Sequence, residues 1–129
     1  MTKQDHVAYW TDLAARDWGA TQSLAAEHGR SALVFAHWTL EKLSKALWIQ
    51  QYDALPPETD TVANILADVP FTLTPTQLHF TQHLEAAHDE VLDPDSEHPL
   101  QLQQTPQQLL QQADTLRLQL LEALHVAVK

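Results

Sequence analysis

A run of ionisable side chains interrupts the apolar segment 35–50, whose sequence is FAHWTLEKLSKALWIQ. His37, Glu41, Lys42 and Lys45 recur at helical spacing, and Glu41 precedes Lys45 by four residues, the favourable order for an ion pair on a helix. A helix whose only role was packing would need one apolar stripe toward the core and polar residues on its solvent-facing side. The segment is therefore either a strongly amphipathic core helix or a sequence signature of function.

Asp17 falls on the apolar stripe expected for the first helix, together with Trp10 and Leu24. A carboxylate placed there requires a partner, which Lys42, Lys45 or a Trp indole N–H could supply. The pair could form part of a nucleotide-phosphate pocket, or it could be an interhelical salt bridge with a structural role.

A metal site is the second chemistry that the spacing allows. His79 and His83 are four residues apart, so both imidazoles would lie on one helix face, and His37 or Glu41 could add a further ligand. The chain contains eight His residues, so a pair at this spacing also arises by chance. We expect no metal, and keep a His-based bundle metalloenzyme as an alternative.

Two of the four Trp residues, Trp38 and Trp48, face away from the expected Leu40–Leu47 stripe. Trp is favoured at protein interfaces because it buries a large area at small entropic cost. We interpret both as interface residues, and a core wrapped by several helices is the alternative.

The elements that position these residues are all expected to be helices. Apolar periodicity predicts four long helices and one short one, at about 4–27, 31–52, 60–68, 75–91 and 106–127. Gly29 is expected just past the end of the first helix, and Thr-Pro-x-Gln sequences at 74–77 and 105–108 predict capping boxes. The expected fold is an all-α, up-down helical bundle that forms one domain over residues 1–129.

Composition restricts the classes of function. The formal net charge is −10, from 7 basic and 17 acidic residues, which disfavours autonomous DNA or RNA binding. The chain has no Cys, no signal-like N-terminus and no apolar run near the roughly 20 residues of a membrane span. We therefore expect a cytoplasmic protein that does not enter a membrane.

The order of these signals resembles the HEPN family, the higher-eukaryote and prokaryote nucleotide-binding domains. The first helix of that family carries Trp, Ala and Asp at the spacing of Trp10, Ala14 and Asp17, and its second helix carries the Glu-Lys-x-x-Lys-Ala sequence found at 41–46. The family pattern is changed at Ala36 and Asp60, which replace His, and its Pro-Asp is kept at 94–95.

The resemblance implies a homodimer that binds a nucleotide or pairs with a small nucleotidyltransferase, often as toxin and antitoxin. Many relatives are metal-independent ribonucleases with an Arg followed a few residues later by His. Here Arg30 and His37 have a similar spacing but an unusual position, and residues 74–104, where the pair would be expected, contain no Arg or Lys. We therefore expect a binding domain without a cofactor and with a degenerate ribonuclease motif, an active ribonuclease being the alternative.

Overall fold

The computed structural model describes residues 2–56, 58, 61–92 and 104–128, the last three by their backbone alone. These residues form five helices and no strand: α1 (Lys3–Leu24), α2 (Gly29–Tyr52), α3 (Val62–Ala67), α4 (Pro75–Leu92) and α5 (Pro106–Val128). The all-helical class expected from the sequence is confirmed. Asp60 and the Pro-Asp at 94–95, which contribute to the family resemblance, lie outside the described residues.

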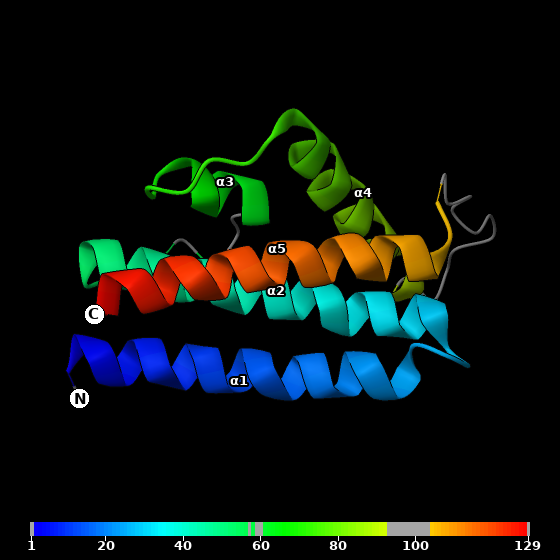
Figure 1. Ribbon diagram of the computed structural model, residues 1–129, viewed down its shortest axis with the longest axis horizontal. Helices are drawn as coiled ribbons and strands as arrows, with labels where there is room; N and C mark the ends of the chain where they lie inside the picture. The colour runs from blue at the N-terminus through cyan, green and yellow to red at the C-terminus, as the bar shows by residue number, and fades with distance from the viewer. Residues whose placement is uncertain (1, 57, 59–60, 93–103, 129) are drawn as a thin grey trace.

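Helix α2 is the centre of the bundle. In Figure 1, α1, α2 and α5 run along the long axis of the molecule, while α3 and the inclined α4 lie on the side away from α1. Each of the other helices approaches α2 to within 8 Å between Cα atoms, whereas α1 reaches this distance to α2 alone among the described helices. Packed helices have axes 8–10 Å apart, so α5 reaches α1 only through side chains, such as Arg117, whose guanidinium carbon lies 4.6 Å from the ring centre of Trp18.

The start of α4 follows from local sequence. The backbone N–H of Gln77 donates to Oγ1 of Thr74 over 3.1 Å, and the backbone N–H of Thr74 donates to Oε1 of Gln77 over 3.0 Å. Thr105 and Gln108 form the same pair of hydrogen bonds at the start of α5, with lengths of 3.1 and 2.9 Å. Both predicted capping boxes are confirmed.

The core lies where the apolar stripes of α2, α4 and α5 meet. Its largest fully buried apolar side chains are Leu33, Leu40, Leu43, Ile65, Leu66, Leu84, Leu109, Leu116 and Leu120. Helix α1 buries only Val7, Ala14 and Thr21, which are seven residues apart. This stripe is narrower than the sequence suggested, because α1 packs against a single helix.

Gly29 is not the residue past the end of α1, and this detail of the sequence reading is wrong. It is the first residue of α2, and its φ angle is not positive. Its small size serves another purpose: a Cβ built on Gly29 would lie 2.8 Å from Cβ of Pro106, the first residue of α5. Gly29 therefore lets the starts of α2 and α5 approach closely.

We expect Gly29→Ala to lower the free energy of unfolding by about 1–2 kcal/mol, because the proline ring cannot move aside as a flexible side chain would. Gly19 provides the matched control. It lies within α1, and a Cβ added there would meet no atom within 4 Å. Gly19→Ala should stabilise the protein by about 0.5–1 kcal/mol through helix propensity. Urea denaturation measures both, and equal stabilisation by the two substitutions would contradict the close approach.

Among the described helices, none combines the length and the apolar character that crossing a bilayer requires.

Candidate functional site

An ion pair between α1 and α2 lies at the centre of the candidate site. The Lys42 ammonium donates to a carboxylate oxygen of Asp17, and the two side chains are 24% and 15% exposed. Asp17 thus has the partner that its position on the apolar stripe required, and of the three candidates it is Lys42. The pair fixes the flank of α1 on α2 at a position that water still reaches.

Glu41 extends this ion-pair network along α2. Its Oε1 lies 2.9 Å from Nζ of Lys45, which confirms the predicted pair between residues four apart. Its other carboxylate oxygen, Oε2, lies 3.7 Å from Nε2 of His37. His37, Glu41, Lys42 and Lys45 therefore belong to one polar surface, and each of them lies next to another ionisable side chain.

Both lysines of this surface lie over Trp rings. Lys45 Nζ is 5.0 Å from the ring centre of Trp10 on α1, and Lys42 Nζ is 5.9 Å from that of Trp38 on α2. These distances allow cation–π attraction. Each ammonium group is thus held between a carboxylate and an indole face.

Helix α4 completes the site with His88. The indole N–H of Trp38 donates to Nε2 of His88 over 2.9 Å, and Nδ1 of His88 lies 3.0 Å from Oδ1 of Asp89. An indole N–H can only donate, so Nε2 must present its lone pair. The hydrogen of the neutral ring is therefore on Nδ1, where it donates to Asp89.

His37 is the buried member of the site. Its ring centre is 4.4 Å from that of His88, and the residue is only 6% exposed. Burial, reinforced by His88, lowers the pKa of His37 from 6.5 to about 4, although Glu41 and Asp89 oppose the shift. His37 is therefore neutral at pH 7.

Glu85 adds a further carboxylate from α4. Burial raises the pKa of Glu85 above its usual value, and the neighbouring carboxylates of Asp89 and Glu41 contribute in the same direction. We call the surface formed by α1, α2 and α4 the Trp38 face, which comprises Trp10, Asp17, His37, Trp38, Glu41, Lys42, Lys45, Glu85, His88 and Asp89. Its carboxylates outnumber its two ammonium groups.

Sequence reasoning did not assign Glu85 or His88 to this site. The three-residue spacing of Glu85 and His88 puts both on one face of α4. No local signal shows that this face meets Trp38.

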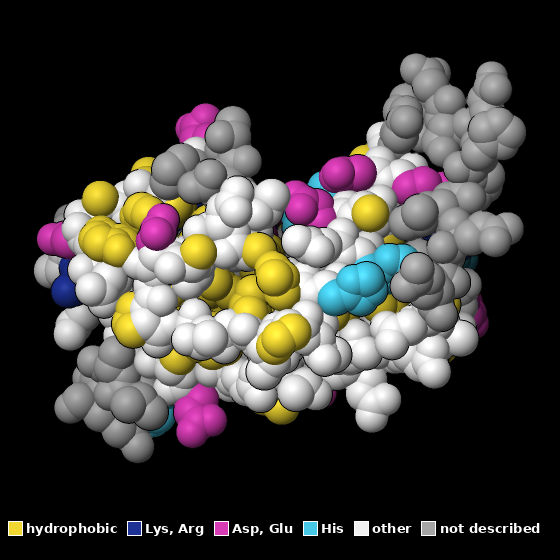
Figure 2. All heavy atoms as spheres, turned by 90° about the horizontal axis from the view of Figure 1, so that it is seen from above, with side chains coloured by type: hydrophobic (Ala, Val, Ile, Leu, Met, Phe, Trp, Pro, Cys, Tyr) yellow, Lys and Arg dark blue, Asp and Glu magenta, His cyan; other side chains and the backbone are white. Residues whose placement is uncertain are grey.

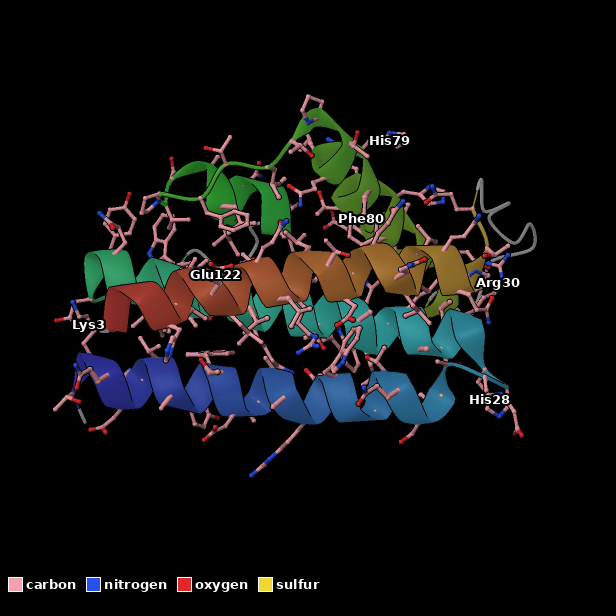
Figure 3. All side chains as sticks on the ribbon, viewed as in Figure 1. Lys3, His28, Arg30, His79, Phe80 and Glu122 are labelled. Atoms are coloured by element: carbon pink, nitrogen blue, oxygen red, sulfur yellow. The ribbon has the colours of Figure 1, made fainter. Side chains whose placement is uncertain are left out.

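Arg30 does not meet His37 in this chain. Its guanidinium group lies 3.3 Å from Oε2 of Glu90, near the end of α4, and its side chain is 43% exposed. Figure 3 shows Arg30 beside the α1–α2 turn, at the end of the molecule. His37 lies two turns further along α2, against His88. Within one chain the two residues therefore occupy different environments.

His79 and His83 share one face of α4, as predicted. Their rings are nearly parallel, at 12°, with centres 6.4 Å apart. Figure 3 shows His79 pointing away from the body of the molecule, and His83 Nε2 is buried without a hydrogen-bond partner. No group of three or more His, Asp or Glu side chains among the described residues is arranged to hold a metal ion.

The two Trp residues assigned to an interface have different surroundings. Trp38 lies in the Trp38 face and its ring centre is 5.1 Å from that of Phe35. Trp48 is partly buried against the hydrophobic core, with its ring centre 4.6 Å from that of Tyr52. Of the two, Trp38 is the one that belongs to a polar surface.

Comparisons with known protein families, with curated proteins and with solved structures found no match to this chain.

Proposed function

We propose that this chain is a HEPN-like binding domain that associates with a protein partner through the Trp38 face. The observation that supports this is the convergence of the Glu41-Lys42-x-x-Lys45 sequence with Trp10, Trp38 and α4 on one partly exposed surface. Trp is enriched at protein interfaces, whose rim is polar.

A nucleotide phosphate fits this surface less well than a protein does. Lys42 is already paired with Asp17, and Lys45 is already paired with Glu41. A phosphate would have to displace these carboxylates and approach Glu85 and Asp89 as well. Repulsion between the phosphate and these carboxylates opposes binding. We therefore favour a protein partner over a nucleotide as the ligand of the Trp38 face.

The proposed partner is a small nucleotidyltransferase in a toxin–antitoxin or stress-response pair, as the resemblance implies. Homodimerisation, also implied, suits the same surface. A two-fold interface places one patch against itself, so a charged patch is self-complementary only when it carries both signs. The Trp38 face contains two of the chain's seven basic residues among its carboxylates, which meets that condition.

We propose no catalytic step for this domain. A ribonuclease of the Arg–His type needs the guanidinium and the imidazole at one phosphodiester. Here Arg30 is paired with Glu90, and His37 is buried beside His88. The binding role therefore has more support than the ribonuclease role.

Co-expression of the tagged chain with the nucleotidyltransferases of its own genome tests the proposal. We expect a stoichiometric complex. Lys45→Glu should weaken it by at least about tenfold, because a second carboxylate beside Glu41 would repel the negative charges of the partner that Lys45 contacts. Arg16→Glu is the matched control. Arg16 is exposed on α1, makes no ion pair among the described residues, and should leave the affinity unchanged.

A thermal-shift series with ATP and GTP separates the two kinds of binding. The partner proposal expects no shift with either nucleotide. A shift that disappears in Lys42→Ala would instead make the Trp38 face a nucleotide site, since a ligand that binds only the folded state raises its stability. Failure of every nucleotidyltransferase to bind, or equal loss with Arg16→Glu, would overturn the proposal.

A further inference from the structure

The hydrogen bond between Trp38 and His88 can exist only while the His88 ring is neutral. An indole N–H can only donate, and a protonated imidazole carries a hydrogen on both ring nitrogens and accepts at neither. Protonation of His88 would add a hydrogen to Nε2, which lies 2.9 Å from the indole nitrogen of Trp38. Two donors would then face each other, so one of the two side chains has to turn away.

The carboxylates on α4 favour the protonated form of His88. Nδ1 of His88 lies 3.0 Å from Oδ1 of Asp89, and a carboxylate binds a charged donor more strongly than a neutral one. Glu85, one turn earlier on α4, also interacts electrostatically with His88. Protonation would therefore keep the contacts of His88 within α4 and remove its contact with α2.

Helix α2 places two further titratable groups near His88. The ring centre of His37 is 4.4 Å from that of His88, and Glu41 lies 3.7 Å from Nε2 of His37. Burial, with His88 acting in the same direction, lowers the pKa of His37 to about 4, so His37 is neutral at pH 5.5. Glu90, the remaining acid of α4 near its end, is paired with Arg30.

The other helices that pack on α4 contribute no charge to this contact. Helix α3 has the sequence VANILA and contains no ionisable residue. The charged residues of α5 lie toward α1: Arg117 pairs with Asp114 and lies over the ring of Trp18, while Glu122 and His125 border the first half of α1. Among the described residues, the response of His88 to acid is therefore set by α2 and α4.

We infer that His88 is a positioning residue that holds Trp38 in place while its ring is neutral and releases Trp38 when the ring takes up a proton. Histidine is the side chain whose charge ordinarily changes between about pH 5 and 8. Release would leave the Trp38 ring, which lies 5.9 Å from Nζ of Lys42, without the hydrogen bond that fixes its orientation. The consequence for binding rests on the proposed function: if Trp38 contacts the partner, acid should weaken the complex.

The indole N–H resonances of the free chain test the switch directly. The chain has four Trp residues, and the resonance that is lost in Trp38→Phe belongs to Trp38. When the pH is lowered from 7.5 to 5.5, this resonance should move upfield and its exchange with water should become about tenfold faster. The resonances of Trp10, Trp18 and Trp48 should move little, which also shows that the fold is kept.

Three variants of histidines on α4 identify the group responsible. His88→Gln offers a carbonyl oxygen that accepts from the indole but does not titrate, so the Trp38 resonance should no longer depend on pH. His88→Leu offers no acceptor and should show the acid form of the resonance already at pH 7.5. His79→Gln is the matched control, because His79 is exposed on the same helix (Figure 3), and it should respond as the wild type does.

Glu85→Gln separates protonation of His88 from that of its neighbour. Burial raises the pKa of Glu85, so this carboxylate also has to be tested. If His88 is the switch, the Trp38 resonance of the variant should still move, with a midpoint at lower pH, because a negative charge that favours the imidazolium is gone. A resonance that no longer moved in Glu85→Gln would assign the response to Glu85 and overturn the inference.

The complex with the nucleotidyltransferase tests the consequence for binding. Between pH 7.5 and 5.5, the wild type should lose about tenfold more affinity than His88→Gln does. Equal losses would overturn the inference, as would a wild-type Trp38 resonance that stayed in place or moved equally in His88→Gln. If no nucleotidyltransferase bound at either pH, the proposed function would fail, and the indole resonances of the free chain would still decide the role of His88.

Discussion

Replacing Leu40 by alanine is expected to lower the free energy of unfolding by about 3 kcal/mol. Leu40 has no exposed surface and lies midway along α2. Every other helix packs on α2, so a cavity there removes contacts that hold several helices. Denaturation by urea should show a lower midpoint with an unchanged slope, because the surface exposed on unfolding stays nearly the same.

Leu118→Ala is the matched control for this prediction. Leu118 is 53% exposed on α5, and Figure 2 shows that apolar side chains are present on the surface over α3, α4 and α5. Its loss should change stability by no more than about 0.5 kcal/mol. A similar loss for the two leucines would mean that α2 is not the centre of the core.

Local sequence was sufficient to predict the helices and the starts of two of them. The Thr and Gln side chains of each capping box are three residues apart, so their hydrogen bonds depend on no distant part of the chain. The function of Gly29 could not be read in the same way. Its neighbour Pro106 is far away in sequence, and only the packed structure shows why a side chain is excluded there.

The same distinction applies to the candidate site. The Glu41–Lys45 pair lies within one helix and was predictable. The need of Asp17 for a partner was also predictable from its place on an apolar stripe, but the choice of Lys42 over Lys45 or an indole N–H was not. The contribution of α4 was not. The Trp38–His88 hydrogen bond joins residues 50 apart in sequence, and it depends on how far α4 is displaced along α2. Helical periodicity specifies a face but not that displacement.

The position of α1 explains why the molecule has two surfaces of different chemistry. Among the described helices α1 packs closely on α2 alone. One of its flanks carries Trp10 and Asp17, whose partners are ion-paired lysines. The other carries Val7 and Asp12 beside a cavity. Figure 2 shows that acidic side chains also outnumber basic ones on the face over α3 and α4.

Lowering the pH from 6.5 to 4 is expected to cost about 3 kcal/mol of stability through His37 alone. The pKa of His37 falls from 6.5 to about 4 in the folded chain because the ring is buried. Between these pH values the unfolded chain binds a proton that the folded chain does not, so protonation favours unfolding. The contribution of neutral His37 is complete above pH 6.5 and is lost as the pH falls toward 4.

Glu85 acts in the opposite direction. Its pKa is raised by burial, so its contribution is present at low pH and is lost as the pH rises through its folded pKa. Glu85→Gln should therefore steepen the loss of stability on acidification. Glu85 therefore offsets part of the loss of stability that His37 causes on acidification.

Urea denaturation at several pH values tests the assignment to His37. His37→Phe keeps an aromatic ring beside His88 but cannot be protonated, so its stability should fall less between pH 6.5 and 4 than that of the wild type. His28, exposed in the α1–α2 turn (Figure 3), gives the matched control, and His28→Phe should keep the wild-type slope. If His37→Phe also kept the wild-type dependence of stability on pH, protonation of the buried His37 imidazole would not be the cause of the loss.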